Sequence, residues 1–339
     1  MKKASAQEFF RPGACKTASD ADVRLLAMIK SAHGEFVSGE KLSRELGISR
    51  AAVWKRIRGL EEAGYRLEGV SHKGYRLVQS PDRILPEEFF GHLSSRRLGR
   101  RLSVLDTVDS TNRVAVEWAS RGLVDGTLIV AEAQTHGRGR LGRCWIASKG
   151  KGLTYSLVLT PNCTLAEVAT ITLAKAVAVA GYMQRSFNIE ARVRWPNDVT
   201  VGTQKICGIL TEVSAQADRI DTAVLGTGIN VNGIASDYGP GAVTLQELTG
   251  KCHDRNRVLA GILSAFEPWY DKVVSGKTAS LLDRANALSA LNGCVIELIT
   301  HNHRFRGTAL GIAPDGSLRV ADAEGKITNF HSGDIIQCV

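Results

Sequence analysis

Nine consecutive residues combine two residue types that suit the binding of an anion. The segment Gly137-Arg138-Gly139-Arg140-Leu141-Gly142-Arg143-Cys144-Trp145, here termed the arginine loop, interleaves glycine with arginine and ends on an indole. Glycine permits positive φ, so successive backbone N–H groups can face one ligand and form an anion-binding nest. Arginine supplies a planar fork of donors that matches phosphate or carboxylate. The segment predicts a loop that closes over an anionic ligand; a solvated basic turn is the alternative.

Three further motifs accompany the arginine loop in a fixed order. Asp109-Ser110-Thr111-Asn112 precedes it, Arg194-Trp195-Pro196-Asn197-Asp198 follows it and leads into Lys205-Ile206-Cys207-Gly208, and Gly226-Thr227-Gly228-Ile229-Asn230 comes last. Together these motifs resemble those of the biotin–protein ligases, whose loop reads GRGRxGR and whose lysine strand lies shortly after a (K/R)WPND segment. The resemblance extends from about Leu105 to the C-terminus. The preceding part resembles the DNA-binding domain of the subset of the family that also represses biotin operons.

The resemblance implies a ligation in two steps. Biotin and ATP, with Mg²⁺, form biotinyl-5′-AMP and pyrophosphate, and a lysine of the biotin carboxyl carrier protein of acetyl-CoA carboxylase then attacks the mixed anhydride. Two anions must be held together while charge develops on the α-phosphate, so the site requires cations rather than a covalent nucleophile. The family also implies binding to operator DNA and a homodimer that forms on adenylate binding.

Lys205 is the residue that we expect at the centre of the chemistry. It lies on a predicted strand among apolar neighbours, where an inward ammonium group is costly unless anions pair with it. We expect it to hold the biotin carboxylate and the α-phosphate together; an edge lysine that reaches solvent is the alternative. The resemblance adds two catalytic residues, Arg138 facing the carboxylate and phosphates, and Arg140 retaining the intermediate.

The resemblance assigns the biotin half of the adenylate to hydroxyl, amide and glycine positions around an uncharged polar head group. These positions, with the two cations that meet the carboxylate, are Ser110, Thr111, Gln134, Arg138, Lys205, Gly208 and Gly226. Ser110 and Thr111 alone would also suit a helix cap. The glycines are expected to let the strand backbone approach the ligand closely.

The nucleotide half is assigned to polar and aromatic positions in the loop and in the later motifs, namely Arg140, Arg143, Trp145, Asn197, Asp198 and Asn230. Trp145 is expected to stack on adenine and Asn230 to bond its edge; core packing is the alternative for the indole. Asp198 is expected either to bind Mg²⁺ or to hold Lys205 or an arginine. As a bare pair, Asn197-Asp198 would equally suit a turn.

The first eighty residues carry the pattern of a DNA-binding domain. They hold 15 Lys and Arg against 9 Asp and Glu, so +6 of the net charge of +9 lies there. A helix is predicted over 21–32, two short helices over 39–46 and 50–63 join at a glycine turn, and two strands form a wing, which is a winged helix-turn-helix. A helical domain with a merely solvated basic face is the alternative. The residues expected to meet the major groove and its phosphates are Ser49, Arg50, Trp54, Lys55 and Arg58.

The remaining pattern predicts an α+β multidomain protein. Strands and helices alternate over 83–288, which predicts a mixed, mainly antiparallel sheet with helices, like the class II synthetases to which the resemblance also points. Short alternating strands over 289–339 predict a small β-barrel, SH3-like by resemblance. Residues 1–20 are expected to form a flexible arm, and 21–80 the DNA-binding domain.

Composition limits the setting of the protein. Its 339 residues contain no apolar run of the roughly 18 residues that a membrane helix requires. The start, Met1-Lys2-Lys3, precedes no apolar stretch typical of a secretory signal. The seven cysteines are scattered without CxxC spacing, so neither a disulfide framework nor a zinc site is indicated. We expect a cytoplasmic protein without a membrane partner.

Three alternatives to a bifunctional ligase and repressor stay open. The first is a repressor that senses biotin or biotinyl-AMP without ligation, the second a ligase with a vestigial DNA-binding domain, and the third a related lipoate ligase. The intact arginine loop and Lys205 argue against the first. The GRGRxGR loop and the predicted terminal barrel argue against the third.

Overall fold

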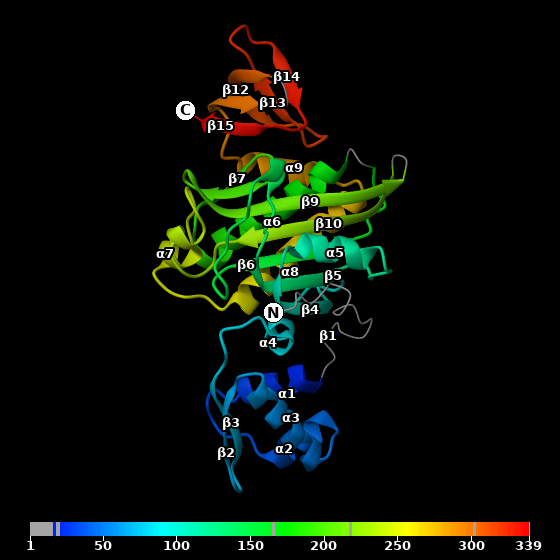
Figure 1. Cartoon of the computed structure of the whole chain (residues 1–339), viewed down its shortest axis with the longest axis vertical. Helices are drawn as coiled ribbons and strands as arrows, with labels where there is room; N and C mark the ends of the chain where they lie inside the picture. Colours follow the sequence, from blue (N-terminus) through cyan, green and yellow to red (C-terminus); the bar gives the residue numbers. More distant parts are fainter. Residues whose placement is uncertain (1–15, 18–20, 165–166, 217–218, 301–302, 339) are drawn as a thin grey trace.

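The computed structural model describes residues 16–17, 21–164, 167–216, 219–300 and 303–338. Figure 1 shows three bodies in a row: a small helical body near the N-terminus, a large central sheet with helices, and a small body of strands at the C-terminus. Within the described residues, every helix is too short or too polar to span a lipid bilayer.

The N-terminal body is a helix-turn-helix with a two-stranded wing, as predicted. Its elements are α1 (Ala21–Lys30), α2 (Gly39–Leu46), α3 (Arg50–Glu62), β2 (Arg66–Val70) and β3 (Gly74–Gln79). The two antiparallel strands form a sheet of their own. The helices pack around a separate apolar core: Leu25, Leu26, Ile29, Leu42, Val53, Ile57 and Leu60.

Local capping explains where the second and third helices begin and end. The Ser38 hydroxyl accepts a hydrogen bond from the Lys41 N–H at 3.2 Å, and the Ser49 hydroxyl accepts one from the Ala52 N–H at 3.1 Å. Gly47, at φ 66°, ends α2 in the left-handed conformation that glycine adopts without steric cost. The turn between the two helices is therefore fixed by Gly47 and Ser49, whereas Ser38 fixes the start of α2.

The central body is built on one eight-stranded sheet in the order β1-β4-β5-β6-β10-β9-β8-β7. β4 and β5 are parallel and all other neighbours are antiparallel, so the predicted mixed, mainly antiparallel sheet is confirmed. The strands are β1 (Lys16–Thr17), β4 (Arg101–Val108), β5 (Thr127–Gln134), β6 (Leu153–Leu159), β7 (Ala191–Arg194), β8 (Asp198–Val201), β9 (Gln204–Gln216) and β10 (Arg219–Ile229).

Helices cover both faces of this sheet, as alternation along the strands requires. On β5, Ile129 packs with Val114 and Trp118 of α5, whereas Leu128 and Val130 face the larger core under α6 and α8. The helices are α4 (Pro86–His92), α5 (Thr111–Ala119), α6 (Val168–Phe187), α7 (Leu245–Thr249), α8 (Arg255–Val274) and α9 (Ala279–Ala287).

The C-terminal body is a five-stranded antiparallel sheet in the order β14-β13-β12-β11-β15. Its buried residues, such as Leu298 and Val320, continue the large core of the central body. The indole N–H of Trp195 also donates to the Gly316 carbonyl at 3.0 Å. The strands are β11 (Val295–Ile299), β12 (Arg304–Ile312), β13 (Leu318–Ala321), β14 (Ile327–Phe330) and β15 (Asp334–Cys338).

The structure departs from the predicted elements at a few places. Most of the predicted arm, 1–20, lies outside the described residues, but Lys16–Thr17 pair with β4. Backbone pairing with an edge strand needs no side-chain periodicity, so the sequence pattern did not predict this two-residue strand. Within 83–288, α7, α9 and β8 were not predicted because each is short.

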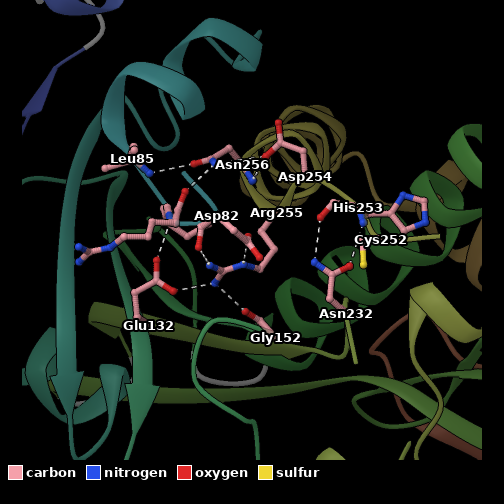
Figure 2. Close-up of polar contacts among 12 residues, drawn as sticks. Asp82, Leu85, Glu132, Gly152, Asn232, Cys252, His253, Asp254, Arg255 and Asn256 are labelled. Carbon is pink, nitrogen blue, oxygen red and sulfur yellow. Dashed lines mark hydrogen bonds and ion pairs between the residues drawn. The ribbon is translucent and has the colours of Figure 1, made fainter. Parts of the chain in front are cut away.

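Residues 80–85 form the linker between the N-terminal body and the central body, and a buried ion pair attaches this linker to the central sheet (Figure 2). The Arg255 side chain, 1% exposed, donates from Nη1 to Oε2 of Glu132 at 2.8 Å and from Nη2 to the Asp82 carbonyl at 3.2 Å. The other oxygen of Glu132 accepts from the Ile84 N–H at 2.6 Å. Breaking such a pair leaves one charge buried alone, so the linker is firmly held.

Candidate active site

The four motifs meet at one cavity between the arginine loop, the central sheet and the C-terminal body. Twelve of the predicted site residues line it: Ser110, Thr111, Gln134, Arg138, Arg140, Arg143, Trp145, Asn197, Asp198, Lys205, Gly208 and Gly226. These residues come from segments more than a hundred positions apart, which only the fold brings together. Asn230 is the predicted residue of this set that does not line the cavity.

Lys205 presents its ammonium group to the cavity. Its Nζ lies 2.7 Å from Oδ1 of Asp198 and 5.5 Å from the centre of the Trp145 ring, and its side chain is 37% exposed. The backbone is held on both sides, since the Lys205 N–H donates to the Gly241 carbonyl at 2.7 Å and its carbonyl accepts from the Val243 N–H at 3.0 Å. The lysine is therefore fixed in place yet reachable by an anionic ligand.

Asn230 is one of the groups that hold this lysine strand. It is 2% exposed, and its Nδ2 donates to the Lys205 carbonyl at 3.0 Å and to the Val243 carbonyl at 3.1 Å. Both amide hydrogens are thus engaged in the protein backbone. In this arrangement Nδ2 of Asn230 holds the Lys205 strand, whereas its buried Oδ1 has no hydrogen-bond partner among the described residues, and a contact with the nucleotide stays a prediction.

Two glycines on neighbouring strands make room for the Trp145 indole. A Cβ on Gly228 would lie 2.2 Å from Cε2 of the ring, and a Cβ on Gly208 would lie 2.9 Å from its Cζ3. The indole therefore lies against β9 and β10. Gly208 thus accommodates the indole and also lines the cavity, so the close approach of a ligand to this strand stays a prediction.

Gly226 likewise faces a side chain. A Cβ there would lie 2.1 Å from Oδ1 of Asn112, which is 3% exposed. Asn112 belongs to the Asp109–Asn112 motif, but its contact with β10 depends on the tertiary fold and was not predicted.

Hydroxyl and amide groups gather at the end of the cavity formed by α5. Ser110 occupies the N-cap position, but its side chain makes no capping hydrogen bond. Oε1 of Gln134 accepts from the Thr111 N–H at 2.7 Å and from its hydroxyl at 3.1 Å. The Ser156 hydroxyl, which sequence reasoning missed, lies 2.8 Å from Oγ1 of Thr111. An uncharged polar head group suits such an array of donors and acceptors.

The three arginines of the loop each contact a different part of the protein. Nη1 of Arg138 donates to Oε1 of Glu212 at 3.0 Å. Nη1 of Arg140 donates to Oδ1 of Asn197 at 3.3 Å, and burial lowers the pKa of its guanidinium. Arg143 pairs with Asp334 at the start of β15.

The C-terminal body contributes to the cavity wall, which sequence reasoning missed. Asp334 and Ile335 line the cavity, and Nη2 of Arg194 donates to the Ile335 carbonyl at 2.9 Å. Asp334 and Ile335 belong to none of the four motifs, and the packing of the C-terminal body on the central body cannot be inferred from local sequence. The loop is therefore held by side chains from two bodies of the protein.

The cavity offers two carboxylates to a metal, Asp198 and Asp334. Mg²⁺ is usually held by one or two carboxylates together with substrate phosphates, so these residues fit a magnesium nucleotide. In the part of the chain that the structure describes, the one group of three His, Cys, Asp or Glu side chains close enough to hold an ion lies elsewhere, at Glu88, His92 and Asp254. There Lys30 of α1 already pairs with Glu88.

The residues predicted to meet DNA lie together on α3. Ser49 caps this helix, and Arg50, Trp54, Lys55 and Arg58 are all exposed. Trp54 is 57% exposed, and the Arg58 guanidinium lies 6.0 Å from its ring centre. A groove beside these residues is bounded by α2 and by the wing at 69–75. An exposed basic helix beside a wing is the arrangement that binds a DNA duplex.

Comparisons with known proteins agree with both halves of this description. Residues 104–230 match the biotin/lipoate A/B protein ligase family, and residues 24–76 match an HTH domain. The bifunctional ligase/repressor BirA of Bacillus spizizenii is 38% identical over 92% of this chain and 97% of its own length, and that of Escherichia coli is 30% identical over 92% and 96%. A solved structure of the biotin protein ligase from Aquifex aeolicus in complex with biotin and ATP is 30% identical with a TM-score of 0.61, over 69% of this chain and 97% of that one.

Proposed function

The chain belongs to the family of bifunctional biotin ligase/repressors, and on that premise we propose that it joins biotin to a protein lysine and represses transcription in response to biotin. The observation that carries the ligase half is the position of Lys205, which pairs with Asp198 in the cavity that the three arginines of the loop also line. The exposed basic helix α3 carries the repressor half.

The chemistry of the first step follows from the charges in the cavity. A carboxylate oxygen of biotin attacks the α-phosphorus of ATP, and pyrophosphate leaves. Lys205 is expected to bridge the carboxylate and the α-phosphate, with Arg138 beside it, so that the repulsion between two anions and the charge developing at phosphorus are both reduced. Asp198 or Asp334 would hold Mg²⁺, which would supply further positive charge beside the phosphates.

The second step requires the adenylate to stay bound until an acceptor arrives. Arg140 and Arg143 reach across to Asn197 and Asp334, so the loop is expected to close over the intermediate. A neutral lysine of the biotin carboxyl carrier protein of acetyl-CoA carboxylase then attacks the acyl carbon, and AMP leaves. Trp145 and Asn197 are proposed to contact the nucleotide, and Asn230 to position Lys205; Ser110, Thr111 and Gln134 are proposed to bind the ureido head.

The repressor half requires coupling between the two sites. We propose that the adenylate favours a homodimer, whose two copies of α3 meet two half-sites of operator DNA with Ser49, Arg50, Trp54, Lys55 and Arg58. We keep the division into an arm (1–20), a DNA-binding domain (21–80), a catalytic domain (83–288) and an SH3-like domain (289–339) as part of this proposal, with the cytoplasm as the setting.

One experiment tests both halves. Full-length protein with biotin, ATP and Mg²⁺ is expected to biotinylate a carrier domain, and to bind DNA upstream of biotin-synthesis genes more tightly when biotinyl-AMP is present. Pyrophosphate release without DNA binding would leave a ligase with a vestigial domain, and DNA binding without pyrophosphate release would leave a sensor. Incorporation of lipoate in preference to biotin would instead identify a lipoate ligase.

A further inference from the structure

Glu212, on β9, joins the arginine loop to the pocket beneath α5. Its Oε1 accepts from Nη1 of Arg138 at 3.0 Å, and its Oε2 accepts from Nδ2 of Asn112 at 2.7 Å. The Glu212 side chain is 28% exposed and that of Arg138 is 57% exposed, whereas Asn112 is buried. One carboxylate thus has a buried partner on one side and an exposed cation on the other.

The buried partner is itself held from three sides. Nδ2 of Asn112 also donates to the Leu210 carbonyl at 3.2 Å, and its Oδ1 lies 2.6 Å from the Ser156 hydroxyl. Its amide packs onto Gly226, where any Cβ would collide with it. These contacts hold the Asn112 amide in place, and its Nδ2 in turn holds one oxygen of the Glu212 carboxylate.

The pair with Arg138 has the opposite character. An ion pair between half-exposed side chains contributes little net stability, because water solvates both charges well when they separate. Arg138 can therefore exchange the Glu212 carboxylate for another anion at small cost. Both Arg138 and Lys205 line the cavity, so the carboxylate of a bound substrate would replace Glu212 as the partner of this arginine.

We propose that Glu212 is a positioning residue that stands in for the substrate carboxylate and keeps Arg138 at the cavity before biotin arrives. The inference rests on the proposed function, since it names biotin as the incoming anion. Holding a long arginine side chain in advance lowers the entropy that binding must remove, so Glu212 aids the binding of charged ligands specifically.

The variant that isolates this role is Glu212→Gln. The glutamine amide oxygen can still accept from Asn112, but its NH₂ group then faces Arg138 and offers it no acceptor. We expect Glu212→Gln to weaken biotin binding by about tenfold, because Arg138 must then lose its rotamer freedom only when biotin binds. Biotinamide, which has the same head group and no carboxylate, should bind both proteins equally.

The test is calorimetric titration of the full-length protein with biotin and with biotinamide. Asp221→Asn is the matched control, because this exposed acid on the neighbouring β10 has no contact with Arg138 among the described residues. Combining Glu212→Gln with Arg138→Ala should give no further loss beyond Arg138→Ala alone, since the two residues act through one contact. Glu212→Asp, which is too short to reach both partners, should give an intermediate loss and serves if the glutamine variant unfolds.

The outcomes separate the two proposals. If the unmodified protein binds neither ligand, the proposed function is overturned and this role with it. If the protein binds biotin but Glu212→Gln has no effect, weakens both ligands equally, or adds to Arg138→Ala, Glu212 is only a structural residue and the inference is overturned.

Discussion

Nζ of Lys205 lies 2.7 Å from Oδ1 of Asp198, on the neighbouring strand and at the edge of the same cavity. The pair explains how an ammonium group is kept beside an indole and apolar strands without an anionic ligand. It also sets the direction of the lysine before substrates bind.

Replacing Lys205 with alanine should bring adenylation close to background. Loss of one charge that stabilises a developing oxyanion typically costs about 10²–10³ in rate. ATP–pyrophosphate exchange with biotin measures the step directly. Lys326→Ala, an exposed lysine of the C-terminal body, should be unchanged, and DNA binding without biotin should survive in both variants. Full exchange activity in Lys205→Ala would refute its role.

Replacing Arg140 with alanine should make the enzyme lose its intermediate. Arg140 bonds to Asn197 and to the Gly333 carbonyl, so its removal detaches the loop from two walls of the cavity. Biotinyl-AMP should then appear free in solution and biotinylate exposed lysines of an added bystander protein such as albumin. Arg306→Ala provides an exposed arginine for comparison. An Arg140→Ala protein that retains its adenylate as well as the unmodified protein would contradict a closing role for the loop.

Gly228→Ala should disturb the cavity through Trp145. The added methyl group would lie 2.2 Å from the ring, so the indole must move. We expect a shifted tryptophan fluorescence and an adenylation rate at least about tenfold lower, since misplaced groups near the reacting atoms are costly. Gly91→Ala, where a Cβ meets nothing within 4 Å, is the control. Unchanged fluorescence and rate would show that Trp145 is not packed in this way.

Lys175 should make stability depend on pH. It is fully buried in α6 between the rings of Tyr155 and Phe266, its Nζ has no hydrogen-bond partner among the described residues, and burial lowers its pKa to about 7. Between pH 7 and 10.5 the unfolded state therefore holds more protons than the folded state at this site, so stability should rise with pH from about 7. The gain is at most about 1.4 kcal/mol per pH unit.

Chemical denaturation at pH 6.5 to 8.5 checks this sign. Burial raises the pKa of the Cys207 thiol to about 12, so this group should lower the free energy of unfolding as the pH rises further. The measurements end at pH 8.5, before this opposite effect begins. Lys175→Met should be more stable than the unmodified protein at pH 6.5 and should lack its rise with pH. The exposed Lys277→Met should follow the unmodified protein. A steeper or unchanged slope in Lys175→Met would contradict the assignment.

Substitutions on α3 should weaken DNA binding without touching ligation. Arg50→Ala and Lys55→Ala each remove an exposed cation, and each lost phosphate contact should lower the slope of log affinity against log salt by about 1. Electrophoretic mobility shift at several salt concentrations measures it, with carrier biotinylation as the parallel assay. Equal slopes in all proteins would place the DNA contacts elsewhere.

The sequence predicted the motifs and most of the elements because each depends on local signals. Ser38 and Ser49 cap the two helices that were predicted over 39–46 and 50–63, and Arg138, Lys205 and Asp198 line one cavity. These positions follow from capping, periodicity and a motif order that the fold preserves.

What the sequence did not predict depends on distant segments. Glu212 and Asp334 hold arginines of the loop because of strand register and of the position of the C-terminal body. Lys175 lies in the alanine-rich helix α6, and no sequence pattern indicates that its side chain is fully buried. The packing of Asn112 on Gly226 and of Trp145 on Gly208 was also not predicted, because it depends on atomic contacts between distant segments.

The most direct test of the central claim is formation of the acyl-adenylate. Purified protein is mixed with biotin, α-labelled ATP and Mg²⁺, without an acceptor, and the protein-bound nucleotide is separated and identified. The account predicts about one biotinyl-AMP per active site together with pyrophosphate. A protein that binds both substrates yet yields neither product would contradict it.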